Sequence, residues 1–359
     1  MYMKKTLLSI ILLAFALNSI AQTKYTISGY VRDSISGEEL IGSIISLKET
    51  PSLGASTNVY GFYSVTAPEG KYNVIIQSMG YNTKRIHLDL NQNKRIDIKL
   101  SENLSQLNEV TVSSEKQNEN ITKTQMSVEK IDIKEIEKIP VIFGEKDILK
   151  TIQLMPGVKS GGEGGSGFFV RGGAADQNLI FLDEANVYNA AHLLGFFSVF
   201  NSDAIKDITL FKGTQPAEYG GRLSSVLDVR MLDGNDKLFG VEGGIGVISS
   251  RLKIDGPIVK EKGSFTISGR RTYADLFLKL SNDSVIRSTK LYFYDLNAKA
   301  NYRINDKNRI FLSGYFGKDV LGFGSTFGID WGNATGTLRW NHLFGSKLFS
   351  NTSVIFSNY

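Results

Sequence analysis

The chain has 359 residues, 42% hydrophobic and 21% charged, with 36 glycines, 6 prolines and no cysteine. The lack of cysteine excludes disulfides and thiolate metal sites, and a formal charge of +5 spread along the chain provides no clustered basic face for nucleic acid. Abundant glycine and aromatic residues favour turn-rich β structure over helical bundles.

Residues 1–21 have the pattern of a cleaved signal peptide. Lys4 and Lys5 give a positive start, residues 7–17 are an apolar run too short to span a bilayer, and residues 19–21 are suited to a cleavage site. We therefore expect export, with cleavage after Ala21. Apolar runs further along are also too short for a spanning helix, so membrane residence would require a barrel.

Residues 22–101 have the pattern of a small β-sandwich. Tyr72, Val74 and Ile76 place bulky side chains on one face, which is typical of a half-buried strand. Turn residues separate the β-prone runs, which lie at residues 25–31, 41–47, 62–65, 72–77, 86–90 and 96–100.

Residues 102–127 have the polar composition of a linker. One β-prone segment interrupts it, formed by Leu107, Asn108, Glu109, Val110, Thr111 and Val112. Two interpretations are open. The segment is the last strand of the preceding sandwich, or it is an exposed segment that a partner protein captures by adding it to a sheet.

Residues 128–232 mix short helices, glycine-rich turns and strands. Helices are predicted at residues 132–138 and 145–154, and strands at 178–183, 205–212 and 223–231. Residues 162–167 match GxGxxG, but a dinucleotide site needs a strand before the glycines and a helix after them. Here the glycines follow a helix and lead into an apolar strand, so we reject nucleotide binding.

Other candidate catalytic groups in this chain do not form a site. Asp183 and Glu184 are adjacent, and successive strand residues face opposite ways, so a turn is favoured over a glycosidase pair. His87, His192 and His342 are scattered without the spacing of a zinc peptidase, so we expect surface or lumen positions. We therefore expect no enzyme, no cofactor and no metal.

Residues 233–359 show the alternation of a transmembrane barrel. In residues 291–303 every second residue is apolar, while the others include Asp295, Asn297, Lys299, Asn301 and Arg303. This phase persists for about twice the usual strand length of about 5–6 residues. Seven strands are expected, at residues 241–248, 250–255, 265–271, 291–303, 310–316, 333–341 and 348–356.

The connections between these strands alternate in length. Residues 256–263, 304–307 and 344–347 resemble short periplasmic turns, and residues 274–290 and 318–330 resemble long extracellular loops. Seven strands cannot close a barrel around a domain the size of residues 128–232, where about 22 are expected. The chain stops inside a strand pattern, so we expect it to be C-terminally truncated.

Two series of motifs resemble known domains. Gly29-Tyr30-Val31-Arg32-Asp33, Gly61-Phe62-Tyr63 and Pro68-Glu69-Gly70 resemble the carboxypeptidase-regulatory-like sandwich that often precedes TonB-dependent receptors in Bacteroidetes. Pro156-Gly157-Val158, Phe169-Val170-Arg171-Gly172-Gly173 and Glu218-Tyr219-Gly220-Gly221-Arg222 resemble the plug of such a receptor. The fold implied is mainly β, with an Ig-like β-sandwich, an α+β plug and the first strands of an incomplete transmembrane β-barrel.

The resemblance implies an outer-membrane receptor that imports a scarce ligand, namely a ferric siderophore, cobalamin, a glycan or a peptide. The inner-membrane TonB–ExbB–ExbD complex would pull on residues 107–112 as a Ton box, and a surface lipoprotein often accompanies glycan and peptide receptors. The alternative is a non-transporting surface binding or sensor module built on the sandwich.

The resemblance also implies which residues hold the plug in its barrel, within outer-membrane lipids. Arg171 and Arg222 are expected to pair with carboxylates of the lumen, and ordinary surface exposure is the alternative. The full set of expected plug–barrel contacts is Arg171, Gly172, Gly173, Gly220, Gly221 and Arg222.

Overall fold

The computed structural model describes residues 23–103, 127–136, 146–162, 167–213, 215–324 and 326–359. The chain divides into two compact units, one formed mainly by the N-terminal strand and residues 39–106, the other mainly by residues 107–343 and the last strand. The predicted signal peptide and residues 107–112 lie outside the described residues. Every helix in the described ranges is too short or too polar to cross a membrane.

The first unit is a β-sandwich of two four-stranded sheets. In one sheet β1 (Lys24–Asp33) pairs with β4 (Phe62–Pro68), β7 (Lys94–Arg95) and β8 (Ile98–Leu100). The other sheet has the order β3 (Thr50–Ser56), β2 (Ile44–Leu47), β5 (Gly70–Gln77) and β6 (Lys84–Leu90). Strand β3 was not predicted, because Pro51 and Gly54 are residues of low β propensity.

The interior of the sandwich is filled by alternate residues from both sheets. Tyr72, Val74 and Ile76 are buried on β5, as their period-2 pattern predicts. They belong to one apolar cluster with Ile27 and Val31 of β1. Burial of such side chains contributes about 1.5–3 kcal/mol each, so this core is the main source of the unit's stability.

We refer to the elements from β9 to β17 as the plug. Its sheet has the order β13 (Ala185–Asn186), β12 (Asn178–Leu182), β17 (Ser225–Met231), β16 (Ile205–Phe211) and β9 (Val128–Asp132). Two hairpins are formed by β10 (Val158–Ser160) with β11 (Phe168–Val170) and by β14 (Ala191–His192) with β15 (Phe197–Ser198). The helices among its described residues are α3 (Ile133–Ile136) and α4 (Ile148–Gln153), with the short 3-10 helices η3 (Ala175–Gln177), η4 (Leu193–Gly195) and η5 (Ser202–Ala204).

Helix α4 shows how the sequence shapes the plug. Asp147 caps its N-terminus by accepting a hydrogen bond from the backbone N–H of Lys150 at 3.0 Å, and Ile148 and Ile152 are buried. The glycine-rich stretch then connects β10 to β11, where the N–H of Gly161 donates to the carbonyl of Gly167 at 3.1 Å. Glycines between two strands do not form a phosphate site at a helix N-terminus.

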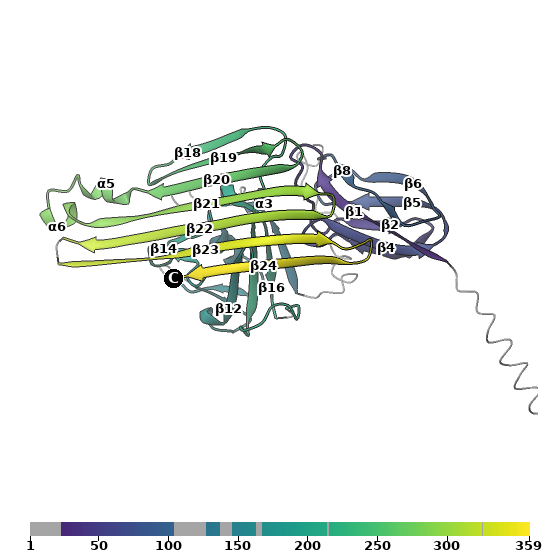
Figure 1. Cartoon of the computed structure of the whole chain (residues 1–359). Helices are drawn as coiled ribbons and strands as arrows, with labels where there is room; N and C mark the ends of the chain where they lie inside the picture. Colours follow the sequence, from purple (N-terminus) through teal and green to yellow (C-terminus); the bar gives the residue numbers. More distant parts are fainter. Residues whose placement is uncertain (1–22, 104–126, 137–145, 163–166, 214, 325) are drawn as a thin grey trace, which may run out of the picture. The chain divides into compact units, whose positions relative to one another are not determined.

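Seven antiparallel strands in chain order form the remaining sheet, which we refer to as the wall (Figure 1). They are β18 (Gly240–Ile245), β19 (Ser249–Val259), β20 (Gly263–Thr272), β21 (Lys290–Asn305), β22 (Asn308–Phe323), β23 (Phe327–Leu343) and β24 (Phe349–Asn358). All seven predicted strands are present. Two short helices, α5 (Ala274–Leu278) and α6 (Ser284–Arg287), lie in the connection from β20 to β21.

One predicted connection is wrong. Residues 318–330 were expected to form a long loop, but β22 and β23 stay paired from Asn308↔His342 to Phe323↔Phe327. The glycines of this stretch suggested a loop, whereas the hydrogen-bonded ladder continues through them. Strand β22 is therefore long enough to place Asp319 on the wall itself.

Burial in the wall is the reverse of burial in the sandwich. On β21, Asp295, Asn297 and Lys299 are buried against the plug side, whereas Leu296 is 49% exposed. On β23, Thr337 and Arg339 are buried in the same way, as the alternation predicts. The exposed apolar side chains of the other face include Leu252, Ile267, Leu312, Phe316, Leu338, Trp340, Val354 and Phe356. A sheet with a polar inner face and an apolar outer face fits a lipid-facing barrel wall.

Candidate functional site

The plug contacts the wall through a tight turn between β12 and β13. Leu182 pairs with Ala185, which leaves Asp183 and Glu184 as a two-residue loop, and both have positive φ (46° and 74°). Two left-handed residues are the requirement of a type I′ hairpin turn, where Asp is tolerated better than most residues. The predicted turn is confirmed, and it points both carboxylates toward the wall.

Lys299 of β21 receives the first of these carboxylates. Its Nζ lies 3.0 Å from Asp183 Oδ2 and 2.8 Å from Asp233 Oδ1, and it donates to the carbonyl of Met231 at 2.8 Å. All three charged side chains are buried. Burial raises the pKa of Asp183, but the charges of Lys299 and Arg339 outweigh this effect and hold that pKa below its usual range. Asp183 is therefore a carboxylate at neutral pH.

Arg339 of β23 receives the second carboxylate. Its Nε lies 3.2 Å from Glu184 Oε1, and the hydroxyl of Ser353 on β24 also donates to Glu184. The hydroxyl of Thr337 donates to the backbone carbonyl of Asp183 at 2.9 Å. We refer to Asp183, Glu184, Asp233, Lys299 and Arg339 as the Lys299 cluster.

A second contact lies at the β14–β15 hairpin of the plug. Asp319 of β22 accepts two hydrogen bonds from this hairpin, one from Nδ1 of His192 and one from the backbone N–H of Leu193, both at 2.7 Å. The other ring nitrogen of His192 lies 3.5 Å from Asp295 and 3.3 Å from the hydroxyl of Tyr315. The imidazole also stacks on Phe293, with ring centroids 4.0 Å apart.

Arg270 of β20 completes this second contact. It bonds Asp295 at 2.6 and 2.9 Å and donates to the plug carbonyl of Ser198 at 2.8 Å. We refer to His192, Arg270, Asp295, Tyr315 and Asp319 as the His192 cluster. Among the described residues, no group of three or more His, Cys, Asp or Glu side chains is arranged to hold a metal ion. The cluster is an ion-pair network between plug and wall.

The loop that carries His192 is strained. Leu193 and Leu194 have φ of 47° and 59°, a region that costs about 1–2 kcal/mol for each residue with a Cβ. Leu193 is buried, whereas Leu194 is 60% exposed. Contacts elsewhere have to hold this backbone, and the bonds from Asp319 to both His192 and Leu193 are placed to do so.

The six residues predicted to hold the plug lie elsewhere on it. The guanidinium of Arg171 donates to Ser127 at 2.7 Å, and that of Arg222 donates to the carbonyl of Gly221. Gly172 and Gly221 have positive φ (83° and 91°), and a Cβ on Gly173 would lie 2.4 Å from Ser224 Oγ. Gly220 has open space where its Cβ would stand. These roles fit the plug's own turns, and pairing of the two arginines with lumen carboxylates stays a prediction.

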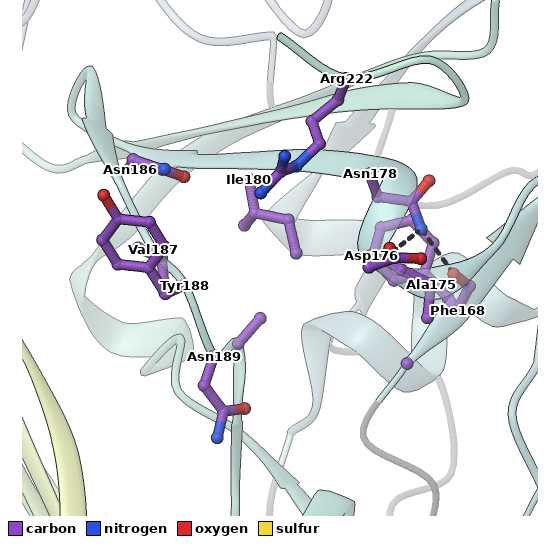
Figure 2. Close-up of a pocket in the computed structure, with 12 residues that line it drawn as sticks. Phe168, Ala175, Asp176, Asn178, Ile180, Asn186, Val187, Tyr188, Asn189 and Arg222 are labelled. Carbon is purple, nitrogen blue, oxygen red and sulfur yellow. Dashed lines mark hydrogen bonds between the residues drawn. The ribbon is translucent and has the colours of Figure 1, made fainter. Parts of the chain in front are cut away.

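Arg222 also borders an open pocket of about 240 Å³ on the plug (Figure 2). Asn178 lines this pocket and donates to the carbonyls of Phe168 and Ala175 at 2.6 and 3.2 Å. Tyr188 and Asn189 lie on the opposite side. Asn189 reaches strand β23, where its carbonyl accepts a 2.8 Å bond from Asn333.

The structure places the three histidines in different surroundings. His87 is exposed and His342 is half-buried, whereas His192 is buried at the contact of plug and wall. A lone histidine inside the apolar run of residues 190–200 is a signal for burial, but its two carboxylate partners lie more than one hundred residues further along the chain.

A mixed α/β domain held by ion pairs to the polar face of a sheet whose other face is apolar defines a plug seated on a membrane-type wall. Residues 27–112 match the family model of the CarboxypepD_reg-like domain, and residues 100–225 match that of the TonB-dependent Receptor Plug Domain. The chain therefore carries the plug domain of TonB-dependent receptors, preceded by a carboxypeptidase-regulatory-like domain, as its motifs indicate.

Solved structures that match part of the chain include two siderophore receptors named PirA. The receptor from Acinetobacter baumannii is 18% identical with a TM-score of 0.46, and that from Pseudomonas aeruginosa is 17% identical with a TM-score of 0.49. FpvA of P. aeruginosa, bound to heterologous pyoverdines, is 12% identical with a TM-score of 0.47. The matches cover 65%, 66% and 65% of this chain but only 39%, 41% and 34% of those receptors. No match was found among curated proteins.

Proposed function

We propose that this chain acts in an outer-membrane receptor that binds a scarce extracellular ligand and imports it when TonB moves the plug. The observation that carries the proposal is the chemistry of the contact between plug and wall. Lys299, Arg339 and His192 join the two by ion pairs and hydrogen bonds. Such bonds can be exchanged for bonds to water at a small net cost, so a polar contact can open where a large apolar one would not.

The outer face of the wall supports residence among lipids. Leu296, Leu312 and Leu338 are exposed on that face, and the buried residues between them are polar. Turning the sheet over would place Lys299 in the hydrocarbon at a cost of about 2–4 kcal/mol. We propose the outer membrane as the location, reached by export and cleavage after Ala21.

The partner that supplies energy is proposed to be TonB, acting with ExbB and ExbD. Residues 107–112 have the β propensity and the polar flanks of a segment that a partner can capture as an added strand. They precede β9, the edge strand of the plug sheet, which pairs with β16. A pull on this segment would therefore reach the plug sheet directly.

The ligand is proposed to be a ferric siderophore, cobalamin, a glycan or a peptide. Glycan or peptide import would also involve a surface lipoprotein. Arg171 and Arg222 remain proposed partners for carboxylates of the barrel, since both guanidinium groups lie on the exposed surface of the plug.

Deleting residues 109–112 tests the coupling. We expect uptake of the ligand to be lost while binding at the cell surface persists, because the deletion removes the proposed TonB-binding segment and leaves the plug intact. A matched control deletes residues 117–120, four polar residues of the same linker, and should leave uptake unchanged. Unchanged uptake in the first variant would contradict the proposal and favour a non-transporting surface module.

A further inference from the structure

We propose that His192 and Asp319 form a proton-controlled latch that holds the plug loop of residues 190–199 against strand β22. In this proposal the protonated imidazole fastens the loop, and loss of its proton frees the loop from the wall. The inference rests on the proposed function in one respect, because it takes the plug as the moving part of the receptor. It adds a control point that is separate from the TonB segment.

One carboxylate holds the loop at two points. Asp319 accepts from the ring of His192 with one oxygen and from the backbone N–H of Leu193 with the other, both at 2.7 Å. The imidazole and the carboxylate are both almost completely buried. The wall is also shaped for this ring, since a Cβ on Gly317 would lie 2.0 Å from the Tyr315 hydroxyl and 3.1 Å from Cε1 of His192.

The charges around His192 favour its protonated form. Facing it from the wall are Asp319 and Tyr315 on β22, Asp295 on β21 and, through Asp295, Arg270 on β20. On the plug side, Asp147 caps α4 and accepts from the N–H of Ser198 at 2.8 Å. Burial raises the pKa of Asp147, which favours its uncharged form. The wall thus places two negative carboxylates, Asp295 and Asp319, near His192 but only one positive guanidinium. A protonated His192 supplies the second positive charge.

The neutral ring fits this position less well than the protonated ring. A neutral imidazole has one N–H and one lone pair. If it donates to Asp319, the lone pair of Nε2 can accept from the Tyr315 hydroxyl at 3.3 Å, but it also faces the carboxylate of Asp295 at 3.5 Å, which repels it. The protonated ring donates on both sides. Burial opposes protonation, but the bonds and charges of Asp295 and Asp319 outweigh it and hold the pKa of His192 above its ordinary value.

The sign of the pH effect follows from this raised pKa. The contact contributes its full stabilisation below the ordinary histidine pKa of about 6.5 and loses it as pH rises through the raised value. The loop itself favours release, because Leu193 and Leu194 are held at positive φ. Proton loss removes the stronger hydrogen bonds, and the backbone can then relax.

The lack of native cysteine allows a direct test. Ala191→Cys places a thiol at a buried position beside His192, and its reaction with a small maleimide reports loop opening in the receptor in outer membranes. Leu194→Cys, exposed on the same loop, corrects for the pH dependence of the thiol itself. We expect the labelling rate of Ala191→Cys, divided by that of Leu194→Cys, to rise between about pH 6 and about pH 9. The rise should be about tenfold for each unit by which the closed loop raises the pKa of His192.

His192→Gln is the decisive partner variant, because glutamine can bond Asp319 but does not titrate. With it, the corrected rate should be high and independent of pH, and Asp319→Asn should also raise the rate at low pH. The same pH dependence with and without His192 would overturn the latch. A corrected labelling rate of Ala191→Cys that does not change with pH would overturn it as well. Hydrogen exchange of residues 190–199 in the cysteine-free receptor gives the same readout if the Ala191→Cys variant does not fold. Labelling needs no uptake, so failure of the latch leaves the import proposal standing.

Discussion

The two contacts between plug and wall place their charges in opposite ways. In the Lys299 cluster the plug supplies Asp183 and Glu184, and the wall supplies lysine and arginine. In the His192 cluster the plug supplies the ring and the wall supplies the carboxylates. Lysine and arginine stay charged over the range in which histidine titrates. The charges of the Lys299 cluster are therefore fixed near neutral pH, whereas those of the His192 cluster can respond to protons.

The pH ranges in which the two contacts fail differ accordingly. The pKa of Asp183 is held low, so the Lys299 cluster contributes its stability above the ordinary aspartate pKa of about 3.9 and loses it as pH falls below that value. The pKa of His192 is held high, so the His192 cluster weakens as pH rises instead. Low pH therefore weakens the Lys299 cluster, and high pH weakens the His192 cluster.

The largest effect is expected from Lys299→Met, which removes the cation of the Lys299 cluster. It leaves Asp183 and Asp233 buried without their shared cation, a loss of about 3–5 kcal/mol. The urea dependence of proteolysis within the plug measures this change. Lys290→Met, at an exposed position on the same strand, is the matched control and should change little.

Removal of the acids should then reverse much of that loss. In Lys299→Met with Asp183→Asn and Asp233→Asn, no unpaired charge remains buried, so most of the stability is expected to return. A cost below about 1 kcal/mol for Lys299→Met alone would show that this contact does not hold the plug.

A smaller effect is expected from Arg339→Met, within the same cluster. Glu184 keeps its bonds to Ser353 and Asn351 and is partly exposed, so water can replace the guanidinium. We expect a loss of about 1–3 kcal/mol in the same assay. A loss as large as that of Lys299→Met would mean that the two ion pairs act as one unit, which the double variant would show as non-additivity.

The sequence predicted the faces of the wall but not its partners. Asp295, Asn297 and Lys299 alternate with apolar residues, and this local period fixes which side they occupy. The pairing of Lys299 with Asp183 joins residues 116 positions apart, and no local pattern encodes such a distance. The turn at Asp183 and Glu184 was predicted from the alternation of strand side chains, without its contact to the wall.

The His192 cluster was hidden for a different reason. Asp319 lies in residues 318–330, which were expected to form a loop. The face of the sheet that its side chain occupies could therefore not be predicted. The predicted contacts of Arg171 and Arg222 came from a family resemblance rather than from local periodicity. Their described bonds go to Ser127 and Gly221 of the same unit.

The smallest effect concerns the strain in the switchable contact, and it is tested by comparing two substitutions at Leu194. At a positive φ, such as that of Leu194, glycine is more stable than alanine by about 1 kcal/mol. In ordinary backbone glycine is less stable than alanine, because the unfolded chain has more conformational entropy at a glycine. Leu194 is exposed, so both changes lose similar packing. If the closed loop stores strain that opening relieves, Leu194→Gly opens more slowly than Leu194→Ala, measured by hydrogen exchange of residues 190–199. Faster opening of the glycine variant would mean that the loop keeps its left-handed backbone when it leaves the wall, and that release depends on the His192 charge alone.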